Sequence, residues 1–430
     1  MQKSLQEKAK AEPTYRFYSL WDKVCREDVL RQAWRLCRSN GGAPGSDGAT
    51  FEAIETGGVE LWLGNLQEEL RTGMYRPLPL LRVWIPKRSG GERPLGIPAI
   101  RDRVAQAAVV LVIGPIFEAD LRSQQYGFRP GLDAKMAVRR AYFHIAEDGR
   151  TEIVDADLTD YFNTIPHGPL MRCVSRRVAD GQVLAVVKRW LEAPVVERCG
   201  SHVRRTAEAR SKHRGTPQGG VISPLLANLY FRRFILGWER SGAATRTQSA
   251  IVNYADDFVL CCRPGNGAAA LEAMRSLMSR IGLQVNERKT HLVRLPEERF
   301  DFLGYTIGRF YGRAGRPYLG TSPSRKSISH ALRQVHAETS RRWVSQTIES
   351  RIERINEILR GWCGYFNQGP VIRIYMRLER YTRWRLRRWL RKKHKGLGHG
   401  SRVTSYEYLH ETLGLYRPFT ELRSRPRAKS

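Results

Sequence analysis

The stretch Ile251-Val-Asn-Tyr-Ala-Asp-Asp-Phe-Val-Leu260 decides the fold, because it places two adjacent carboxylates between two runs of β-forming side chains. This pattern predicts a hairpin with Asp256 and Asp257 at its tip. Aspartate favours turns, so both acids could simply face water. Two neighbouring carboxylates between buried strands also repel each other, and a cation between them removes that cost. The stretch alone therefore leaves two interpretations open, a solvated turn and a site for Mg²⁺.

Two further elements lie upstream of this hairpin. A β-forming run at residues 152–154 ends in Asp155 and Asp157, and Asp160 follows. Aspartate is common at helix N-termini, and Asp160 suits that structural role better than Asp157 does. The Gly-Thr-Pro-Gln-Gly-Gly loop at 215–220 precedes an apolar helix and lets backbone approach a ligand, although alone it is a weak signal. The order of strand-end acid, Gln-Gly-Gly loop and Tyr-Ala-Asp-Asp hairpin is that of polymerase palm motifs.

Further motifs extend this match over nearly the whole chain, from about residue 25 to 415. They are a loop at 40–48, a hairpin at 83–98, Tyr126-Gly-Phe-Arg-Pro-Gly131, Val285-Asn-Glu-Arg-Lys-Thr290, Phe302-Leu-Gly-Tyr305 and Gly361-Trp-Cys-Gly-Tyr-Phe366. The sequence resembles the reverse transcriptases and maturases encoded by group II introns, in the form that lacks the HNH endonuclease domain. No cluster of paired cysteines and histidines follows Cys363, so we expect no second-strand DNA cleavage.

The resemblance implies an α+β fold: a right-hand polymerase with fingers and palm, followed by an all-α thumb or maturase domain. The expected parts are an N-terminal extension with the loop motif (1–75), reverse transcriptase fingers and palm (76–320), a helical thumb or maturase X domain (321–370) and a basic nucleic-acid-binding region (371–430). Helical periodicity predicts two buried faces in the N-terminal extension. One carries Leu30, Trp34, Leu36 and Cys37, and the other carries Leu61, Leu66 and Leu70.

The resemblance also implies an active site. Asp157, Asp256 and Asp257 would be catalytic and would bind two Mg²⁺ ions. The dNTP would contact Lys87 and Arg93 as phosphate clamps, Phe162 as the ring that selects deoxyribose, Gln218 at the nascent base pair, and Lys289 as a candidate proton donor to pyrophosphate. Lys289 could equally be a solvated loop lysine, and Phe162 a core aromatic. Phe302, Leu303, Gly304 and Tyr305 would grip the primer.

The charge balance indicates a polyanionic partner. Lys and Arg total 73 and Asp and Glu total 42, which gives a net charge of +31 and a pI near 10.4. Much of the excess follows residue 371, where one helix is expected to carry an apolar stripe at Ile374, Leu378, Tyr381 and Trp384. It also carries an RNA-binding stripe at Arg373, Arg377, Arg380, Arg383, Arg387 and Arg391. Trp384 and Trp389 could pack or could stack on bases, and packing is the safer expectation.

The expected partners are an RNA template and primer, dNTPs, group II intron RNA and target DNA, with a homodimer also open. The N-terminus is polar, the cysteines are scattered and no run of about 18 apolar residues occurs, so we expect a bacterial cytoplasmic protein that does not enter a membrane. Three hypotheses remain: a polymerase that is also a splicing maturase, a domesticated polymerase serving defence, CRISPR or repair, and an RNA-binding splicing cofactor with an inert polymerase site.

Overall fold

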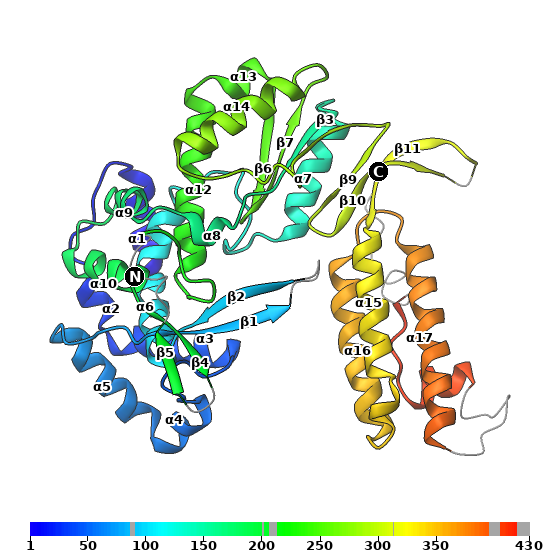
Figure 1. The fold of residues 1–430 in the computed structure, drawn as a ribbon, viewed down its shortest axis with the longest axis horizontal. Helices are drawn as coiled ribbons and strands as arrows, with labels where there is room; N and C mark the ends of the chain where they lie inside the picture. The colour runs from blue at the N-terminus through cyan, green and yellow to red at the C-terminus, as the bar shows by residue number, and fades with distance from the viewer. Residues whose placement is uncertain (87–90, 200–201, 206–212, 313, 395–404, 419–430) are drawn as a thin grey trace. The chain divides into compact units, whose positions relative to one another are not determined.

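The computed structural model describes residues 1–86, 91–199, 202–205, 213–312, 314–394 and 405–418. The chain divides into two compact units, shown in Figure 1. The first comprises Met1–Asp133 and Val154–Leu292, and the second comprises Ala134–Ile153 and Val293–Ser430. Helices and small sheets are mixed, as expected for an α+β chain. The finer domain boundaries expected from the sequence stay a prediction.

The N-terminal part of the first unit is helical, as predicted. Its helices are α1 (Gln2–Ala11), α2 (Trp21–Val24), α3 (Glu27–Asn40), α4 (Phe51–Gly57) and α5 (Val59–Arg71). Two of the residues predicted to be buried are not: Leu36 is 41% exposed and Leu61 is 69% exposed. The buried face of α3 holds Leu30, Trp34 and Cys37, and that of α5 holds Leu63, Leu66 and Leu70. Each set follows the spacing of three and four residues, which Leu36 and Leu61 break.

Helix α6 (Ile100–Glu118) runs through the core of the first unit and is buried on nearly all sides. Helices α1 and α3 pack against it. The loop at residues 40–48 is fastened to its start, because the Arg103 guanidinium donates to the backbone oxygens of Gly41 and Ala43. A Cβ on Gly45 would lie 2.5 Å from the Ala99 Cα, so only glycine allows this approach. The Gly-rich motif is thus a packed connection.

The first sheet has the strand order β2-β1-β4-β5. Its strands are β1 (Leu80–Pro86), β2 (Glu92–Ile97), β4 (Val195–Cys199) and β5 (His202–Arg205). Strands β1 and β2 form the antiparallel hairpin expected from the sequence, and β1 pairs with β4 in parallel.

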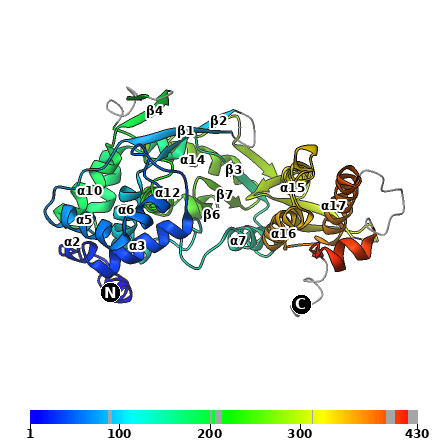
Figure 2. The same cartoon turned by 90° about the horizontal axis from the view of Figure 1, so that it is seen from below.

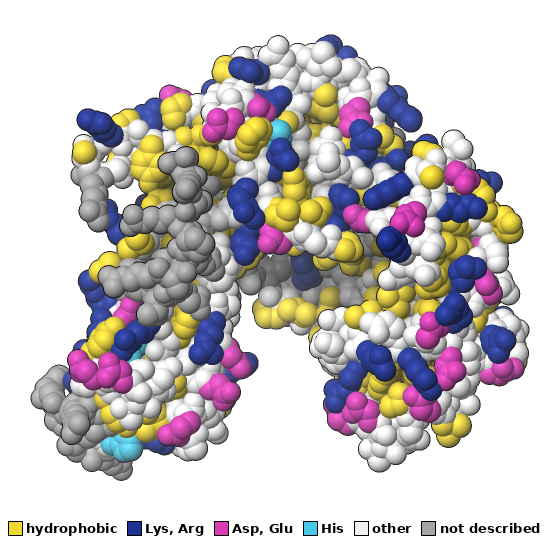
Figure 3. Space-filling model, turned by 180° about the vertical axis from the view of Figure 1, so that it is seen from behind, with side chains coloured by type: hydrophobic (Ala, Val, Ile, Leu, Met, Phe, Trp, Pro, Cys, Tyr) yellow, Lys and Arg dark blue, Asp and Glu magenta, His cyan; other side chains and the backbone are white. Residues whose placement is uncertain are grey.

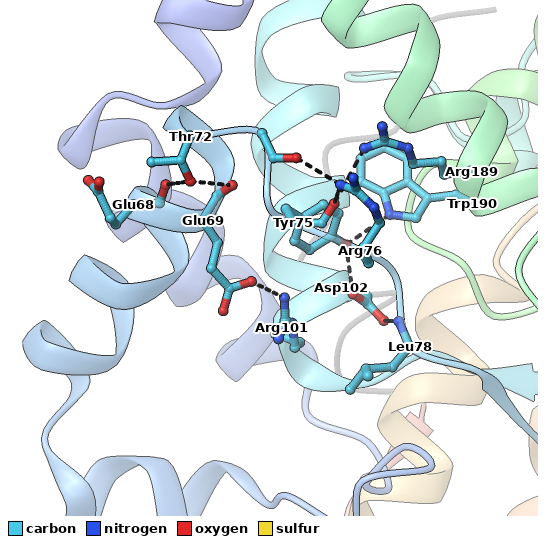
Figure 4. Close-up of polar contacts among 11 residues, drawn as sticks. Glu68, Glu69, Thr72, Tyr75, Arg76, Leu78, Arg101, Asp102, Arg189 and Trp190 are labelled. Atoms are coloured by element: carbon cyan, nitrogen blue, oxygen red, sulfur yellow. Dashed lines mark hydrogen bonds and ion pairs between the residues drawn. The ribbon is translucent and has the colours of Figure 1, made fainter.

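A buried polar cluster fixes the chain just before this sheet (Figure 4). The Tyr75 hydroxyl donates to Asp102 Oδ1 at 2.6 Å, and the Leu78 N–H donates to Asp102 Oδ2 at 3.0 Å. Trp190 Nε1 donates in turn to the Tyr75 hydroxyl at 3.0 Å. Burial raises the pKa of Asp102 to about 6, and the hydrogen bonds from Tyr75 and Leu78 oppose that rise.

The second sheet has the strand order β6-β7-β3-β8. Its strands are β3 (Glu152–Ala156), β6 (Ala250–Tyr254), β7 (Asp257–Cys262) and β8 (His291–Arg294), and the division into units runs through β3 and β8. The helices of this part are α8 (Tyr161–Thr164), α9 (His167–Ser175), α10 (Gly181–Leu191), α12 (Ser223–Arg240), α13 (Ala243–Arg246) and α14 (Gly267–Arg280). Phe231, Phe234 and Phe258 meet within 5.5 Å of one another, which packs α12 against β7.

The second unit contains α7 (Ala134–Ala146), a three-stranded sheet and a group of helices. The sheet order is β11-β10-β9, with β9 (Arg299–Phe302), β10 (Tyr305–Tyr311) and β11 (Pro317–Pro323). The remaining elements are α15 (Arg325–Glu338), η1 (Arg341–Trp343), α16 (Ile348–Tyr365), α17 (Ile372–Lys393) and η3 (Tyr408–Thr412). Figure 2 looks along α15, α16 and α17, and α15 packs against both of the others. Ile352, Ile355, Leu359 and Trp362 of α16 are buried.

The surface carries the excess of positive charge across the face shown in Figure 3, where Lys and Arg side chains are more numerous than Asp and Glu. None of the helices in the described residues is both long and apolar enough to cross a membrane.

Candidate active site

The Tyr-Ala-Asp-Asp hairpin forms as the sequence predicts. Tyr254 pairs with Asp257, so Ala255 and Asp256 make the two-residue turn. Ala255 has φ +59°, a left-handed conformation that costs a non-glycine residue about 1 kcal/mol. The side chain of Asn253, which is fully buried, donates to the Ala255 carbonyl at 2.8 Å and so holds this turn. No motif in the sequence indicates this role of Asn253.

The Tyr126–Gly131 motif packs against the β6–β7 hairpin. Tyr126 N–H donates to the Asn253 carbonyl at 2.8 Å, and Asn228 Nδ2 donates to the Gly127 carbonyl at 2.7 Å. A Cβ on Gly127 would lie 2.5 Å from the Ala255 nitrogen, so any larger residue must push the turn away. Local residue patterns could not reveal this contact, because it joins segments far apart in the chain.

Asp157 directly follows β3, which is hydrogen-bonded to β7 in the same sheet. The segment 285–290 surrounds its carboxylate. Asn286 Nδ2 donates to Asp157 Oδ2 at 3.0 Å, and Lys289 Nζ lies 3.2 Å from the same oxygen. The Asp157 N–H donates to Thr290 Oγ1 at 3.3 Å. Sequence reasoning identified Lys289 and missed Asn286 and Thr290, whose side chains hold the strand end in place.

The three aspartates lie close enough for their charges to affect the pKa values of the two hairpin acids. Burial, together with the charges of Asp256 and Asp157, raises the pKa of Asp257 to about 6. Burial also raises the pKa of Asp256, which the Arg93 charge lowers and the Asp157 charge raises. The Asp257 side chain still reaches solvent, so a ligand has a path to it. The charge of Asp157 thus raises the pKa of both hairpin acids, and a cation would neutralise the negative charge that the three carboxylates share.

These carboxylates fit a hard divalent cation by their chemistry, because oxygen donors of full negative charge are what Mg²⁺ and its relatives prefer. In the described part of the chain, no three His, Cys, Asp or Glu side chains already converge as a metal-binding group. Asp157 instead turns its carboxylate to Lys289 and Asn286. Binding an ion would therefore require Asp157 to exchange the Lys289 ammonium for the metal.

The other residues predicted to bind the dNTP differ in their burial and in their contacts. Arg93 is exposed on β2 and close enough for its charge to lower the pKa of both hairpin acids. Phe162 is half-buried against Tyr161, and its carbonyl accepts from the Thr216 N–H at 2.7 Å. Gln218 Nε2 donates to Asp160 Oδ1 at 3.4 Å. Lys87 lies outside the described residues.

A cavity of about 760 Å³ lies beside the Gln-Gly-Gly loop in the same unit. Asp160 and Gln218 border it on one side, and Arg82 and Trp84 of the first sheet also line it. Trp84 is 49% exposed and has the Arg82 guanidinium 5.9 Å from its ring. An exposed indole and a guanidinium can stack on bases and contact phosphates.

The predicted primer grip lies in the second unit, at the β9–β10 hairpin. Phe302 pairs with Tyr305, which leaves Leu303 and Gly304 as the turn. The side chains of Phe302 and Tyr305 are buried, and the Tyr305 hydroxyl donates to the Tyr365 carbonyl at 2.6 Å. These two side chains therefore pack within the unit, and only the turn residues offer surface for a primer.

The predicted basic stripe lies on α17, and its residues differ in exposure. Arg373, Arg377 and Arg380 are exposed. Arg383 is partly buried and lies 3.7 Å from Glu379, while Arg387 and Arg391 are intermediate. The expected apolar stripe needs one correction: Trp384 is 51% exposed, and the buried face continues to Trp389, which is 1% exposed.

Comparison with known proteins gives two family matches. Residues 85–307 match the model of the reverse transcriptase (RNA-dependent DNA polymerase), and residues 328–406 match the group II intron maturase-specific domain. Protein YkfC of Escherichia coli K12 is 32% identical over 77% of this chain and 94% of its own length. The group II intron-encoded protein LtrA of Lactococcus lactis subsp. cremoris is 29% identical over 51% of this chain and 35% of its own length. The chain belongs to the reverse transcriptase family, the RNA-dependent DNA polymerases, and carries the group II intron maturase-specific domain.

Proposed function

We propose that this chain copies RNA into DNA at Asp157, Asp256 and Asp257. The observation that supports the proposal is the placement of these carboxylates on the neighbouring strands β3 and β7, where the charges of Asp157 and Asp256 raise the pKa of Asp257. Such a cluster is unfavourable without a cation, and clusters of perturbed acids are typical of functional sites. The membership of the reverse transcriptase family supports the same reaction.

We further propose that the three carboxylates hold two Mg²⁺ ions. Bound Mg²⁺ would activate the primer 3′-hydroxyl and stabilise the leaving pyrophosphate. The chain's own groups position the reactants: Asn253 and Gly127 fix the hairpin, and Asn286 orients Asp157. Preorganised ligands cost no rearrangement at the moment of reaction.

The dNTP would be held by the residues that surround these acids. Arg93 would contact the triphosphate, as would Lys87, and Phe162 would exclude a ribose 2′-hydroxyl. Lys289 would transfer from Asp157 to the leaving phosphates once a cation replaces it. Gln218 would meet the nascent base pair, and the cavity between Trp84 and Gln218 would take the template strand.

The second unit would act on the nucleic acid outside the catalytic centre. The helices α15 and α16 would form the thumb, with the primer grip at the Leu303–Gly304 turn. The exposed arginines at the start of α17 would contact intron RNA or target DNA through phosphates. This division assigns residues 76–320 to fingers and palm, 321–370 to the thumb and 371–430 to nucleic-acid binding. A maturase role follows from the maturase-specific domain, and a domesticated polymerase is the alternative.

Primer extension on an RNA template in Mg²⁺ tests the proposal. Asp256→Asn should lower extension about a thousandfold or more and leave affinity for template–primer within a few-fold. Glu287→Gln is the matched control, because it removes a nearby charge that pairs with Arg275 instead. Robust extension by Asp256→Asn would overturn the site. A wild-type chain that binds RNA but never extends a primer would favour the inert splicing cofactor.

A further inference from the structure

A second concave site lies in the first unit, between α9 and α12. It is a pocket of about 340 Å³, and five arginines line it: Arg172, Arg176, Arg232, Arg233 and Arg240. Arg172 lies on α9, Arg176 directly follows the end of that helix, and the other three arginines lie on α12. Neither the sequence motifs nor the catalytic proposal gives these residues a task.

The positive charge of this pocket is not balanced by the protein. Among the lining residues that the structure describes, Asp120 is the single acid. Asp120 lies 3.6 Å from Arg177, a fully buried arginine outside the pocket lining. Glu239, the acid next to Arg240, pairs with Arg122 at 2.8 Å. The pocket therefore holds five guanidinium groups against one carboxylate that already has a partner.

The arginines differ in how firmly the protein holds them. Arg232 Nε donates to the Asp120 carbonyl at 2.6 Å, and Arg233 Nη1 donates to the Tyr230 hydroxyl at 3.2 Å. Arg172, Arg176 and Arg240 are exposed, and within the described residues their side chains make no hydrogen bond or ion pair. Burial lowers the pKa of Arg232, and the Arg176 charge lowers it further, which shows that these like charges lie close together. Two anchored and three available guanidinium groups suit a polyanion.

The size and shape of the arrangement decide which polyanion fits. Arg232 and Arg240 are eight residues apart, which is about 12 Å along the helix, and Arg172 and Arg176 add a second row at the C-terminal end of α9. A single small anion could meet only part of that span. Guanidinium groups match phosphate oxygens with paired hydrogen bonds better than they match scattered acidic side chains. Phe117, Leu229 and Ile281 add apolar surface to the lining, which a ribose or base could contact.

We propose that this pocket, lined by the five arginines, binds the phosphate backbone of RNA at a place separate from the catalytic centre. The separation follows from α12. Its first residue, Ser223, adjoins the Gln-Gly-Gly loop, whereas Arg240 ends the helix about 25 Å further along its axis. RNA held here need not be the strand that is being copied. The site would let the chain hold a folded RNA while it extends a primer.

The test uses the full chain with its catalytic cleft filled by excess unlabelled template–primer. A labelled RNA hairpin with a blocked 3′ end is then titrated at several salt concentrations. The pocket variant is Arg172→Gln/Arg176→Gln/Arg240→Gln, and the charge-matched control is Arg35→Gln/Arg71→Gln/Arg263→Gln, three exposed arginines outside the pocket. Both variants should keep the wild-type Tm and extend a short template–primer at the wild-type rate.

The pocket variant should bind the hairpin about tenfold or more weakly, and the slope of log affinity against log salt should fall by about two to three. The control should change affinity less than about threefold. Equal losses in the two variants would overturn the proposal. Two competitors, tripolyphosphate and polyglutamate, decide the ligand class. The RNA proposal fails if either competitor binds the pocket variant more weakly than the wild type while the RNA hairpin binds both proteins equally. The pocket would then be a site for small anions or acidic peptides.

Discussion

Lys289 Nζ lies 3.2 Å from Asp157 Oδ2, the same oxygen that accepts a hydrogen bond from Asn286 at 3.0 Å. The chain thus places a positive charge on the carboxylate that would otherwise bind a metal ion. The Lys289 side chain is 63% exposed, so this ion pair is weak and exchangeable. Within segment 285–290, Asn286 therefore supports the Asp157 carboxylate, and Lys289 competes with a metal ion for it.

Lys289→Met should tighten divalent-ion binding to the free protein, because no ammonium competes for Asp157. An exposed pair is worth at most about 1 kcal/mol, so the gain should reach about fivefold at most. Titration of Mn²⁺ followed by electron paramagnetic resonance measures this affinity without needing activity. Lys289→Arg keeps the charge and should resemble the wild type. Weaker Mn²⁺ binding by the methionine variant would show that Lys289 organises the acids instead of competing.

Gly127→Ala should slow primer extension although Gly127 bears no chemical group. The added Cβ would lie 2.5 Å from the Ala255 nitrogen and would displace the turn that carries Asp256. A shift of about 1 Å in a catalytic group can cost about a hundredfold in rate. Gly64→Ala in α5 is the control, because no atom lies within 4 Å of its added Cβ. Equal extension rates in the two variants would remove Gly127 from the support of the site.

Phe162→Ala should raise the incorporation of ribonucleotides relative to deoxyribonucleotides. The half-buried ring would stand below the sugar, and its removal would make room for a 2′-hydroxyl. The measurement is the ratio of kcat/KM for dGTP and GTP on one template. Phe143→Ala, an exposed aromatic on α7, controls for loss of a ring elsewhere. An unchanged ratio would make Phe162 a packing residue, the simpler interpretation of its sequence position.

Asp102→Asn should change stability in a pH-dependent way. The folded-state pKa of Asp102 is about 6, above its ordinary value of 3.8, because burial disfavours the charged form. The folded state therefore binds the proton more tightly, and this contribution is complete below about pH 4 and lost as pH rises through 6. The wild type should lose up to about 3 kcal/mol across that window relative to Asp102→Asn. Urea unfolding at pH 4.5 and 7 measures the difference, which should stay constant for the exposed Asp301→Asn control.

The sequence predicted the hairpins β1–β2 and β6–β7, because those features follow from local periodicity and from ordered motifs. It assigned Leu36 and Leu61 to buried faces, because hydrophobicity alone does not separate a residue on the face from its neighbour one or two places away. It could not find Asn253 or Asn286, whose value depends on carbonyl and carboxylate groups brought near by folding. The primer contact of the 302–305 turn stays a prediction, and the structure buries the side chains of Phe302 and Tyr305.

Two tryptophans of α17 separate packing from nucleic-acid binding within one helix. Trp389 is 1% exposed, and truncation to alanine should cost about 3–5 kcal/mol of unfolding free energy. Trp384 is 51% exposed and has the guanidinium groups of Arg385 and Arg388 within 6 Å of its ring. Trp384→Ala should change stability by less than about 1 kcal/mol.

The same Trp384→Ala variant should weaken RNA binding about fivefold or more, because a base stacked on an aromatic ring contributes about 1–3 kcal/mol. Urea unfolding measures the stability of both variants, and RNA titration measures their affinity. Stability should fall in Trp389→Ala, and RNA affinity should fall in Trp384→Ala. Trp389→Ala should keep its RNA affinity at temperatures where it remains folded. If Trp384→Ala binds RNA as the wild type does, the exposed ring is not a stacking platform, and the arginines of α17 would contact phosphates without a base beside them.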